Sequence, residues 1–170
     1  TGESALMAMM MMNNRMAEIM ANQRNRRWEQ IFSPPLKGQT VLILGVGELG
    51  GSAARTAKRF GLKVVGVRRT GGKHPAVDKM VKPDKLMKVL PEADHVLVTL
   101  PVTSSTRKMI GAKQIAAMKK TASLINFGRS AVVDYEALRA ALNKGHLVGA
   151  FLDVFDQEPL PASSPLWHTE

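Results

Sequence analysis

A short apolar run that ends in closely spaced glycines limits what this chain can fold into. Residues 41–44 are apolar, Gly45, Gly47 and Gly50 follow in the spacing G-x-G-x-x-G, and an alanine-rich stretch continues to Phe60. A strand, a glycine turn and a helix in this order are typical of a dinucleotide-binding βαβ unit. Gly45 would permit the tight turn, Gly47 the close approach of a pyrophosphate, and Gly50 the packing of helix against strand. Glycines also mark plain turns, but the flanking strand and helix favour the nucleotide interpretation.

Two further residues lie inside this turn. Glu48 and Leu49 stand between the second and third glycines, and we include both in the predicted cofactor site. A carboxylate close to a pyrophosphate is electrostatically unfavourable. We therefore expect the Glu48 side chain to face solvent, while N–H groups at the helix N-terminus bind the phosphates.

The rest of the chain alternates apolar segments with amphipathic ones. Strands are expected at 41–44, 63–67, 95–100, 123–126 and 148–153, helices at 49–60, 84–90, 112–118 and 135–144, and a glycine-rich loop at 70–75. Because these strands are apolar on both faces, they indicate a buried parallel sheet. The pattern predicts an α/β fold, a doubly wound parallel sheet of the Rossmann type, with its ligand at the carboxyl ends of the strands.

A methionine-rich segment precedes this alternation. Residues 5–20 predict one helix with a broad apolar side, and Ser33, Pro34 and Pro35 end the helical region. Such a helix could pack in the core or against another domain or subunit, and the sequence favours neither. We assign 1–33 to a connecting and dimerisation helix and 34–170 to the dinucleotide-binding domain.

Composition restricts the remaining functions. The net charge is +10, which a nucleic-acid-binding protein would share, but lysines such as Lys79, Lys82, Lys85 and Lys88 are spread over expected helix surfaces and aromatic residues make up only 5%. We therefore expect no nucleic-acid partner. No apolar run is long enough for a membrane span, so no membrane partner is expected, and no residue cluster predicts a metal site. The absence of cysteine fits a reducing compartment, and we expect a cytoplasmic protein.

The end of the second expected strand should decide which dinucleotide binds. An NAD-preferring domain places Asp or Glu there, whereas this chain has Arg68, Arg69 and Thr70. Guanidinium groups would bind a 2′-phosphate that a carboxylate would repel. A hydrogen bond to a charged group contributes about 1.5–3 kcal/mol, so NADP(H) should bind about tenfold or more tightly than NAD(H), which can also bind. The alternative is that both arginines are solvated loop residues.

Several downstream motifs carry a resemblance to a known family. They are Leu-Pro-Glu-Ala-Asp at 90–94, Leu-Pro-Val-Thr at 100–103, Asn-Phe-Gly-Arg at 126–129 and Leu-Asp-Val-Phe-Asp-Gln-Glu-Pro-Leu-Pro at 152–161. In their order and spacing they resemble the D-isomer-specific 2-hydroxyacid dehydrogenases, over nearly the whole chain. One small departure is Ser130, where that family usually has Gly.

The resemblance implies roles for individual residues. Arg129 would hold the carboxylate of a 2-oxo acid and polarise its carbonyl, and Glu158 would orient a catalytic histidine and raise its pKa. Asp153 would bind the nicotinamide carboxamide. The other residues implied to contact the cofactor are Leu100, Pro101, Thr106, Phe127 and Gly128, together with Arg129. Without the resemblance, each charged residue has a structural interpretation. Arg129 could cap a helix or form an ion pair, Asp153 could be a turn residue at the end of a strand, and Glu158 could be an exposed loop carboxylate.

The resemblance also implies an activity. The family reduces small 2-oxo acids such as glyoxylate or hydroxypyruvate to D-2-hydroxy acids, and a homodimer is expected. Its catalytic histidine lies further along the chain than residue 170, and His74, His95, His146 and His168 match no catalytic position. The substrate-domain segments are expected to be missing as well, so these residues alone should bind nucleotide without turnover. The alternative is a nucleotide-sensing co-regulator or another protein-interaction module of the same fold.

Overall fold

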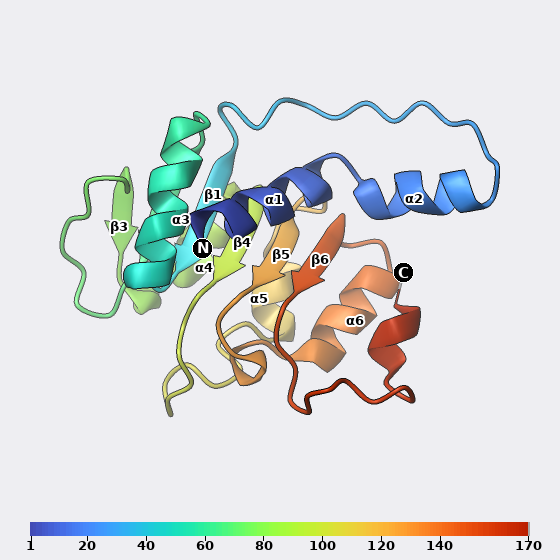
Figure 1. Ribbon diagram of the computed structural model, residues 1–170. Coiled ribbons are helices and arrows are strands. Elements are labelled where there is room, and N and C mark those ends of the chain that lie inside the picture. Colours follow the sequence, from blue (N-terminus) through green and yellow to red (C-terminus); the bar gives the residue numbers. More distant parts are fainter. Residues whose placement is uncertain (170) are drawn as a thin grey trace.

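Six parallel strands form one sheet in the order β3-β2-β1-β4-β5-β6 (Figure 1). The computed structural model describes residues 1–169. The strands are β1 Thr40–Leu44, β2 Lys63–Val67, β3 Lys79–Val81, β4 His95–Val98, β5 Ser123–Asn126 and β6 Gly149–Leu152. Because every neighbouring pair is parallel and the order reverses between β1 and β4, the predicted doubly wound sheet is confirmed.

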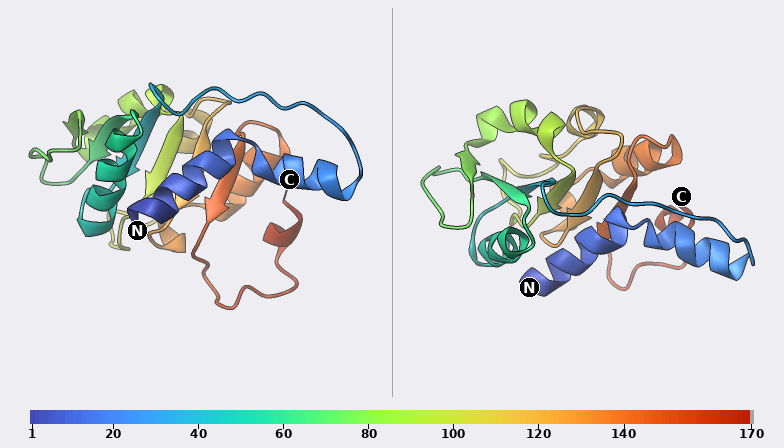
Figure 2. Two further views of the ribbon diagram at one scale, coloured as in Figure 1. Left: turned by 45° about the horizontal axis from the view of Figure 1, so that its top comes forward. Right: turned by 90° about the horizontal axis from the view of Figure 1, so that it is seen from above.

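Helices cover both faces of this sheet (Figure 2). They are α1 Gly2–Asn13, α2 Met16–Arg24, α3 Glu48–Arg59, α4 Leu86–Val89, α5 Ala112–Ala116 and α6 Tyr135–Asn143, with 3-10 turns at Pro83–Lys85, Leu90–Glu92, Ser130–Val132 and Pro165–His168. Helices α1 and α3 lie on one face, and α4, α5 and α6 lie on the other. Each connection between parallel strands is right-handed, so the direction in which the chain moves along the sheet decides which face its helix covers. Helix α3 belongs to a connection that moves from β1 toward β3, whereas α4, α5 and α6 belong to connections that move toward β6, and they therefore lie on the opposite face.

The apolar core is divided between these two faces. Leu42 and Leu44 point toward the α4–α6 side, while Val41 and Ile43 point toward α1 and α3, and all four are fully buried. This alternation follows from the period of two along a strand. Burying one such side chain stabilises the fold by about 1.5–3 kcal/mol, so β1 is anchored from both sides.

The predicted single N-terminal helix is wrong, because it breaks into α1 and α2. The side-chain amide of Asn14 donates to the Met10 carbonyl oxygen at 2.8 Å, and Arg15 follows in the left-handed region at φ 52°. Asparagine side chains compete with the backbone for such hydrogen bonds and favour helix ends. In α1, Ala5, Ala8 and Met9 are buried against the sheet and α3, so core packing applies to this part of the segment. No residue of α2 is buried.

Strand β3 is not among the strands predicted from the sequence. It is three residues long, lies at the edge of the sheet and carries no apolar run, which leaves little pattern to detect. As a consequence, Lys79 lies on a strand and Lys82 directly follows it, and neither lies on the helix surface predicted for it.

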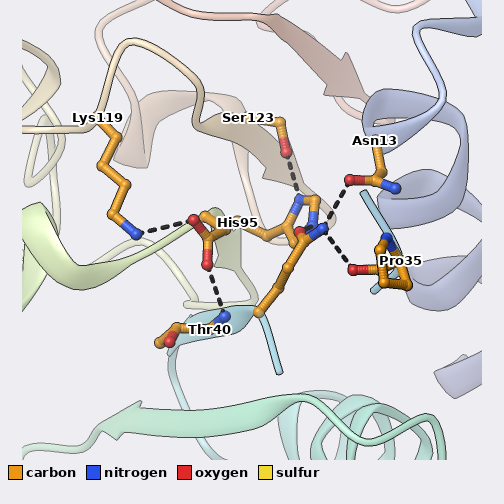
Figure 3. Close-up of polar contacts among 8 residues, drawn as sticks. Asn13, Pro35, Thr40, His95, Lys119 and Ser123 are labelled. Carbon is orange, nitrogen blue, oxygen red and sulfur yellow. Dashed lines mark hydrogen bonds and ion pairs between the residues drawn. The ribbon is translucent and has the colours of Figure 1, made fainter. Parts of the chain in front are cut away.

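A buried histidine, His95, links several elements at the amino edge of the sheet, where the parallel strands begin (Figure 3). His95 is 3% exposed, and its Nδ1 and Nε2 lie 2.8 Å from Ser123 Oγ and 3.0 Å from Gln39 Oε1. The Gln39 amide nitrogen donates to Asn13 and to the Pro35 carbonyl oxygen, so its oxygen must accept from His95 Nε2. Nε2 therefore carries a proton, and in the neutral ring Nδ1 accepts from the Ser123 hydroxyl.

Burial lowers the pKa of His95 to about 4, against the opposing effect of the adjacent Asp94 carboxylate. Asp94 itself accepts from the Thr40 backbone N–H at 2.8 Å and from Lys119 Nζ at 2.8 Å (Figure 3). Together these contacts join the start of β1, the end of α1 and the bases of β4 and β5.

Candidate functional site

The glycine turn lies where the strand order reverses, at the carboxyl end of β1. Gly45 has φ 98°, a left-handed conformation that favours glycine, and its N–H donates to the Val67 carbonyl oxygen at 3.0 Å. Its own carbonyl oxygen accepts from Thr99 Oγ1 at 2.6 Å, which ties the turn to the end of β4. A Cβ at Gly50 would overlap the Gly45 carbonyl oxygen, so the contact between α3 and β1 requires glycine.

The start of α3 is open toward solvent. Gly47 is the N-cap and supplies no side-chain capping bond, and the N–H groups of Glu48, Leu49 and Gly50 have no acceptor in the described part of the chain. Gly47 is exposed, and a Cβ there would meet no protein atom within 4 Å. Free N–H groups at the start of a twelve-residue helix and an unobstructed backbone fit the diphosphate of a dinucleotide. Glu48 is exposed, as expected.

The loops after β4 and β5 meet beside this turn. A Cβ at Gly45 would lie 2.9 Å from Leu100 Cδ2, and one at Gly128 would lie 2.6 Å from the Leu100 carbonyl oxygen. The approach at Gly128 is to backbone and leaves no room for a side chain, whereas Gly45 requires glycine chiefly because of its left-handed φ. The structure thus brings together the predicted residues Gly45, Leu100 and Gly128 at the carboxyl edge of β1, β4 and β5.

Thr106 shapes the loop that follows Leu100. Its side chain is 8% exposed, and its hydroxyl donates to the Pro101 carbonyl oxygen at 2.7 Å and accepts from the Thr103 N–H at 2.8 Å. The hydroxyl is therefore used within the turn itself, and Thr106 would act on a ligand through the conformation of this loop.

Arg129 and Glu158, the two residues with implied catalytic roles, line one open pocket of about 420 Å³. Arg129 is exposed, and its Nη1 donates to the Gly128 carbonyl oxygen at 2.9 Å. It makes no capping bond and no ion pair within residues 1–169, so neither structural alternative for it is seen. Glu158 is also exposed, and its Oε1 accepts from the Phe155 N–H at 2.9 Å.

Two connections join the loop of Arg129 to the loop of Glu158, and sequence reasoning missed both. Ser130, 9% exposed, donates from its hydroxyl to Asp156 Oδ1 at 2.6 Å. Tyr135 donates from its hydroxyl to the Val154 carbonyl oxygen at 2.7 Å and accepts from Asn126 Nδ2 at 3.0 Å. The departure of Ser130 from the family pattern was the available signal for the first connection.

The environment of Tyr135 keeps its hydroxyl protonated. Burial raises the pKa of Tyr135 to about 12; the hydrogen bond from Asn126 acts against this, and the carboxylates of Asp156 and Glu158 add to it. Because a protonated hydroxyl can donate, the hydrogen bond to the Val154 carbonyl oxygen persists across the neutral pH range.

The remaining predicted residues lie along the same edge. Arg68, Arg69 and Thr70 are exposed after β2, and neither arginine has an ion-pair partner in the described chain. Asp153 is exposed after β6, and its N–H donates to the Asn126 carbonyl oxygen at 3.1 Å. Phe127 packs on Phe151 with ring centroids 5.5 Å apart.

None of the four histidines lines the pocket of Arg129 and Glu158. His95 lies at the opposite edge of the sheet, His146 Nε2 contacts the Ile115 carbonyl oxygen, and His74 Nδ1 accepts from the Ala76 N–H. His168 is exposed in the 3-10 turn near the C-terminus. Within residues 1–169, no group of three or more His, Asp or Glu side chains could hold a metal ion, and none of the helices has the length and apolar character to cross a membrane.

A larger apolar cavity lies away from the glycine turn. Its volume is about 770 Å³, and it is open to solvent and lined by α2, α6, β6 and the 3-10 turn Pro165–His168, with Met16, Leu142 and Trp167 in its wall. The two arginines in its wall, Arg15 and Arg139, are each paired with a carboxylate, Glu18 and Glu136 respectively, so the glycine turn is the better candidate for a dinucleotide.

Comparison with known proteins places these features in one family. Residues 6–170 match the D-isomer specific 2-hydroxyacid dehydrogenase, NAD binding domain. The chain is 35% identical to a glyoxylate reductase of Korarchaeum cryptofilum (strain OPF8), over 100% of this chain and 53% of that protein. It is 37% identical to glyoxylate/hydroxypyruvate reductase B of Yersinia pestis (strain Pestoides F), over 98% of this chain and 53% of that protein.

A solved structure agrees with these relatives. A D-isomer specific 2-hydroxyacid dehydrogenase from Xanthobacter autotrophicus Py2, in complex with NADPH and MES, superimposes with a TM-score of 0.91 at 35% identity and covers 98% of this chain and 53% of that one. The chain therefore spans about half the length of the relatives it matches. These three names are those of reductases and a dehydrogenase, and they give no support to the co-regulator alternative.

Proposed function

We propose, since this chain belongs to the D-isomer specific 2-hydroxyacid dehydrogenase family, that it is the nucleotide-binding half of a reductase for small 2-oxo acids. The reductase would convert a substrate such as glyoxylate or hydroxypyruvate to the D-2-hydroxy acid. The observation that carries this proposal is the glycine turn at the strand-order reversal, beside the pocket of Arg129 and Glu158.

The proposed cofactor is NADP(H), with NAD(H) bound more weakly. Arg68, Arg69 and Thr70 extend from the end of β2, where the fold binds the adenosine ribose, and the guanidinium groups are free of carboxylate partners within residues 1–169. The NADPH bound to the Xanthobacter relative supports the same preference. Exposure weakens each contact, yet one charge-assisted hydrogen bond of about 1.5 kcal/mol is enough for about tenfold discrimination.

When bound, the nicotinamide supplies a hydride for reduction of the 2-oxo carbon. Arg129 would bind the substrate carboxylate through two parallel hydrogen bonds and polarise the adjacent carbonyl, since a guanidinium remains charged at any physiological pH. Glu158 would orient a catalytic histidine and favour its protonated form, which donates a proton to the carbonyl oxygen. Asp153, at the end of β6, would fix the nicotinamide carboxamide.

The proposed assembly is a cytoplasmic homodimer in which residues 1–33 contribute to the interface. Ile19, Met20, Trp28 and Phe32 are exposed large apolar side chains on and after α2, and the apolar cavity borders the same helix. Apolar surface of this kind favours association. Light scattering coupled to size-exclusion chromatography would give the mass of a dimer, and a monomer at micromolar concentration would contradict this assembly.

Isothermal titration calorimetry tests the nucleotide site with the 170-residue chain itself. We expect NADPH to bind about tenfold or more tightly than NADH, and Arg68→Asp to reverse the order. Equal affinities, or tighter binding of NADH, would overturn the preference, and no binding of either nucleotide would overturn the function. The activity is tested separately by assaying the full-length protein with NADPH and a panel of 2-oxo acids, whereas the chain alone should bind without turnover.

A further inference from the structure

The edge strand β3 brings a lysine to the end of β2. Val67 and Val81 are in register, and the Arg68 N–H donates to the Val81 carbonyl oxygen at 3.0 Å. Lys82 is the next residue, so it leaves β3 at the carboxyl edge directly beside Arg68. Figure 1 shows β3 at one end of the sheet, where the loops that follow β2 and β3 lie side by side.

The side chain of Lys82 lies along the turn that follows Arg68. The Gly71 N–H donates to the Arg68 carbonyl oxygen at 3.0 Å and closes this turn. A Cβ at Gly71 would lie 3.8 Å from Lys82 Cε and 4.0 Å from Lys82 Cγ, so the aliphatic stem of the lysine passes close to the glycine. The ammonium nitrogen is one bond beyond Cε and therefore lies near the same turn.

Lys82 forms no ion pair within the described residues, unlike its neighbours, and its charge acts only as a weak, secondary influence that lowers the pKa of Asp84. Lys79 lies 3.7 Å from Glu92, and Lys85 lies 3.1 Å from Asp84. Lys82 is exposed and has no ion-pair partner among the residues that the structure describes. Three cations, Arg68, Arg69 and Lys82, thus share one corner of the carboxyl edge.

We propose that Lys82 is a specificity-determining residue that binds the 2′-phosphate of NADP(H) together with Arg68 and Arg69. This inference rests on the nucleotide function and cofactor preference proposed above. A phosphate monoester carries a charge of about −1.5 to −2 at neutral pH and presents three acceptor oxygens, more than one guanidinium can neutralise. An ammonium group on a flexible stem offers three donors that can adjust to such a ligand.

Calorimetric titration of NADPH and NADH into Lys82→Met tests this role. Methionine keeps an apolar stem beside Gly71 and removes only the charge, and the position is exposed, so the fold should be retained. We expect the Kd for NADPH to rise about tenfold and the Kd for NADH to change less than about twofold, because only NADPH carries the 2′-phosphate. Lys82→Arg should keep most of the NADPH affinity.

Lys88→Met is the matched control. Lys88 is another exposed lysine, on α4, and its replacement makes the same change in net charge. Neither Kd should change by more than about twofold in this variant. Equal weakening of NADPH in both variants would show a general effect of charge and overturn the proposal.

Other outcomes separate this inference from the cofactor preference. Suppose that the wild-type chain prefers NADPH, that Arg68→Asp abolishes this preference and that Lys82→Met leaves it intact. This result would refute the role of Lys82, while the proposed cofactor preference would stand. Equal weakening of NADPH and NADH by Lys82→Met would also refute it. A wild-type chain that binds both nucleotides equally refutes the preference and the lysine's part in it together.

Discussion

We expect the protein to lose stability between pH 7.5 and 5, because His95 is held neutral at the amino edge of the sheet. Burial lowers the pKa of His95 from its ordinary value of 6.5 to about 4, and Ser123 and Gln39 already occupy both ring nitrogens. In the unfolded chain the same imidazole takes up a proton near pH 6.5. Below that pH the unfolded state binds more protons than the folded state, so the free energy of unfolding falls as the pH falls, until the folded state also protonates near pH 4.

The size of this effect follows from the pKa difference. One pKa unit corresponds to about 1.36 kcal/mol, so the full loss is about 3 kcal/mol, and about 2 kcal/mol of it falls between pH 7.5 and 5. Domains of this kind have unfolding free energies of about 5–15 kcal/mol. The loss is therefore a sizeable fraction of the total and lies within reach of denaturant titrations.

Urea unfolding followed by circular dichroism across this pH range measures it. His95→Gln removes the titrating group, and His168→Gln is the control because His168 is exposed. We expect His95→Gln to be less stable than wild type at pH 7.5 but to lose about 2 kcal/mol less on going to pH 5, while His168→Gln follows wild type. If wild type and His95→Gln lose the same free energy over this range, the buried imidazole is not held neutral and the reasoning is wrong.

Three further predictions concern the turns and loops of the carboxyl edge. Gly50→Ala should lower the free energy of unfolding by about 1–3 kcal/mol, because the new Cβ meets backbone. Gly47→Ala should cost at most about 1 kcal/mol, since alanine is a poorer N-cap than glycine, and should weaken NADPH binding. Denaturant unfolding and calorimetry on the two variants separate stability from binding, and a larger loss of stability in Gly47→Ala than in Gly50→Ala would contradict the open geometry at Gly47. Asp134→Ala should lower the free energy of unfolding by about 1 kcal/mol through loss of the α6 N-cap. Hydrogen bonding holds the pKa of this carboxyl below its ordinary 3.8, so the carboxylate stabilises the fold at neutral pH and loses this effect in acid. In urea titrations the unfolding free energies of wild type and variant should therefore converge only as the pH falls below about 4. Ser130→Ala should lower the free energy of unfolding by about 1 kcal/mol, a modest loss because its partner Asp156 is exposed. In a double-mutant cycle followed by thermal unfolding, Asp156→Ala should cause little further loss in the Ser130→Ala background. Additive losses would show that the two side chains act independently.

The parts of the fold that sequence predicts well depend on local signals. The glycine turn, the capping of α6 by Asp134 and the left-handed Gly61 after α3 each follow from residues within one turn of chain. The strands β1, β4 and β5 are buried on both faces and therefore show continuous apolar runs. The resemblance placed Arg129 and Glu158, and the structure brings both to one pocket.

The parts that were missed depend on distant partners. Strand β3 exists because β2 offers it an edge, and its three residues carry no pattern of their own. The proximity of Lys82 to Arg68 follows from that pairing and could not be read from a spacing of fourteen positions. The hydrogen bond from Ser130 to Asp156 likewise joins loops that follow two different strands.

Helix α1 limits where a shortened version of this nucleotide-binding unit can begin. The helices of the connections that follow β3 all lie on the opposite face, so no helix from within residues 34–152 covers the α1 side of β5 and β6. Ala5, Ala8 and Met9 close that side, where Ile125 and Phe151 would otherwise meet water. A truncation or graft that starts at the first strand would lose one of the two helices that cover this face, so any transplanted unit must carry its leading helix with it.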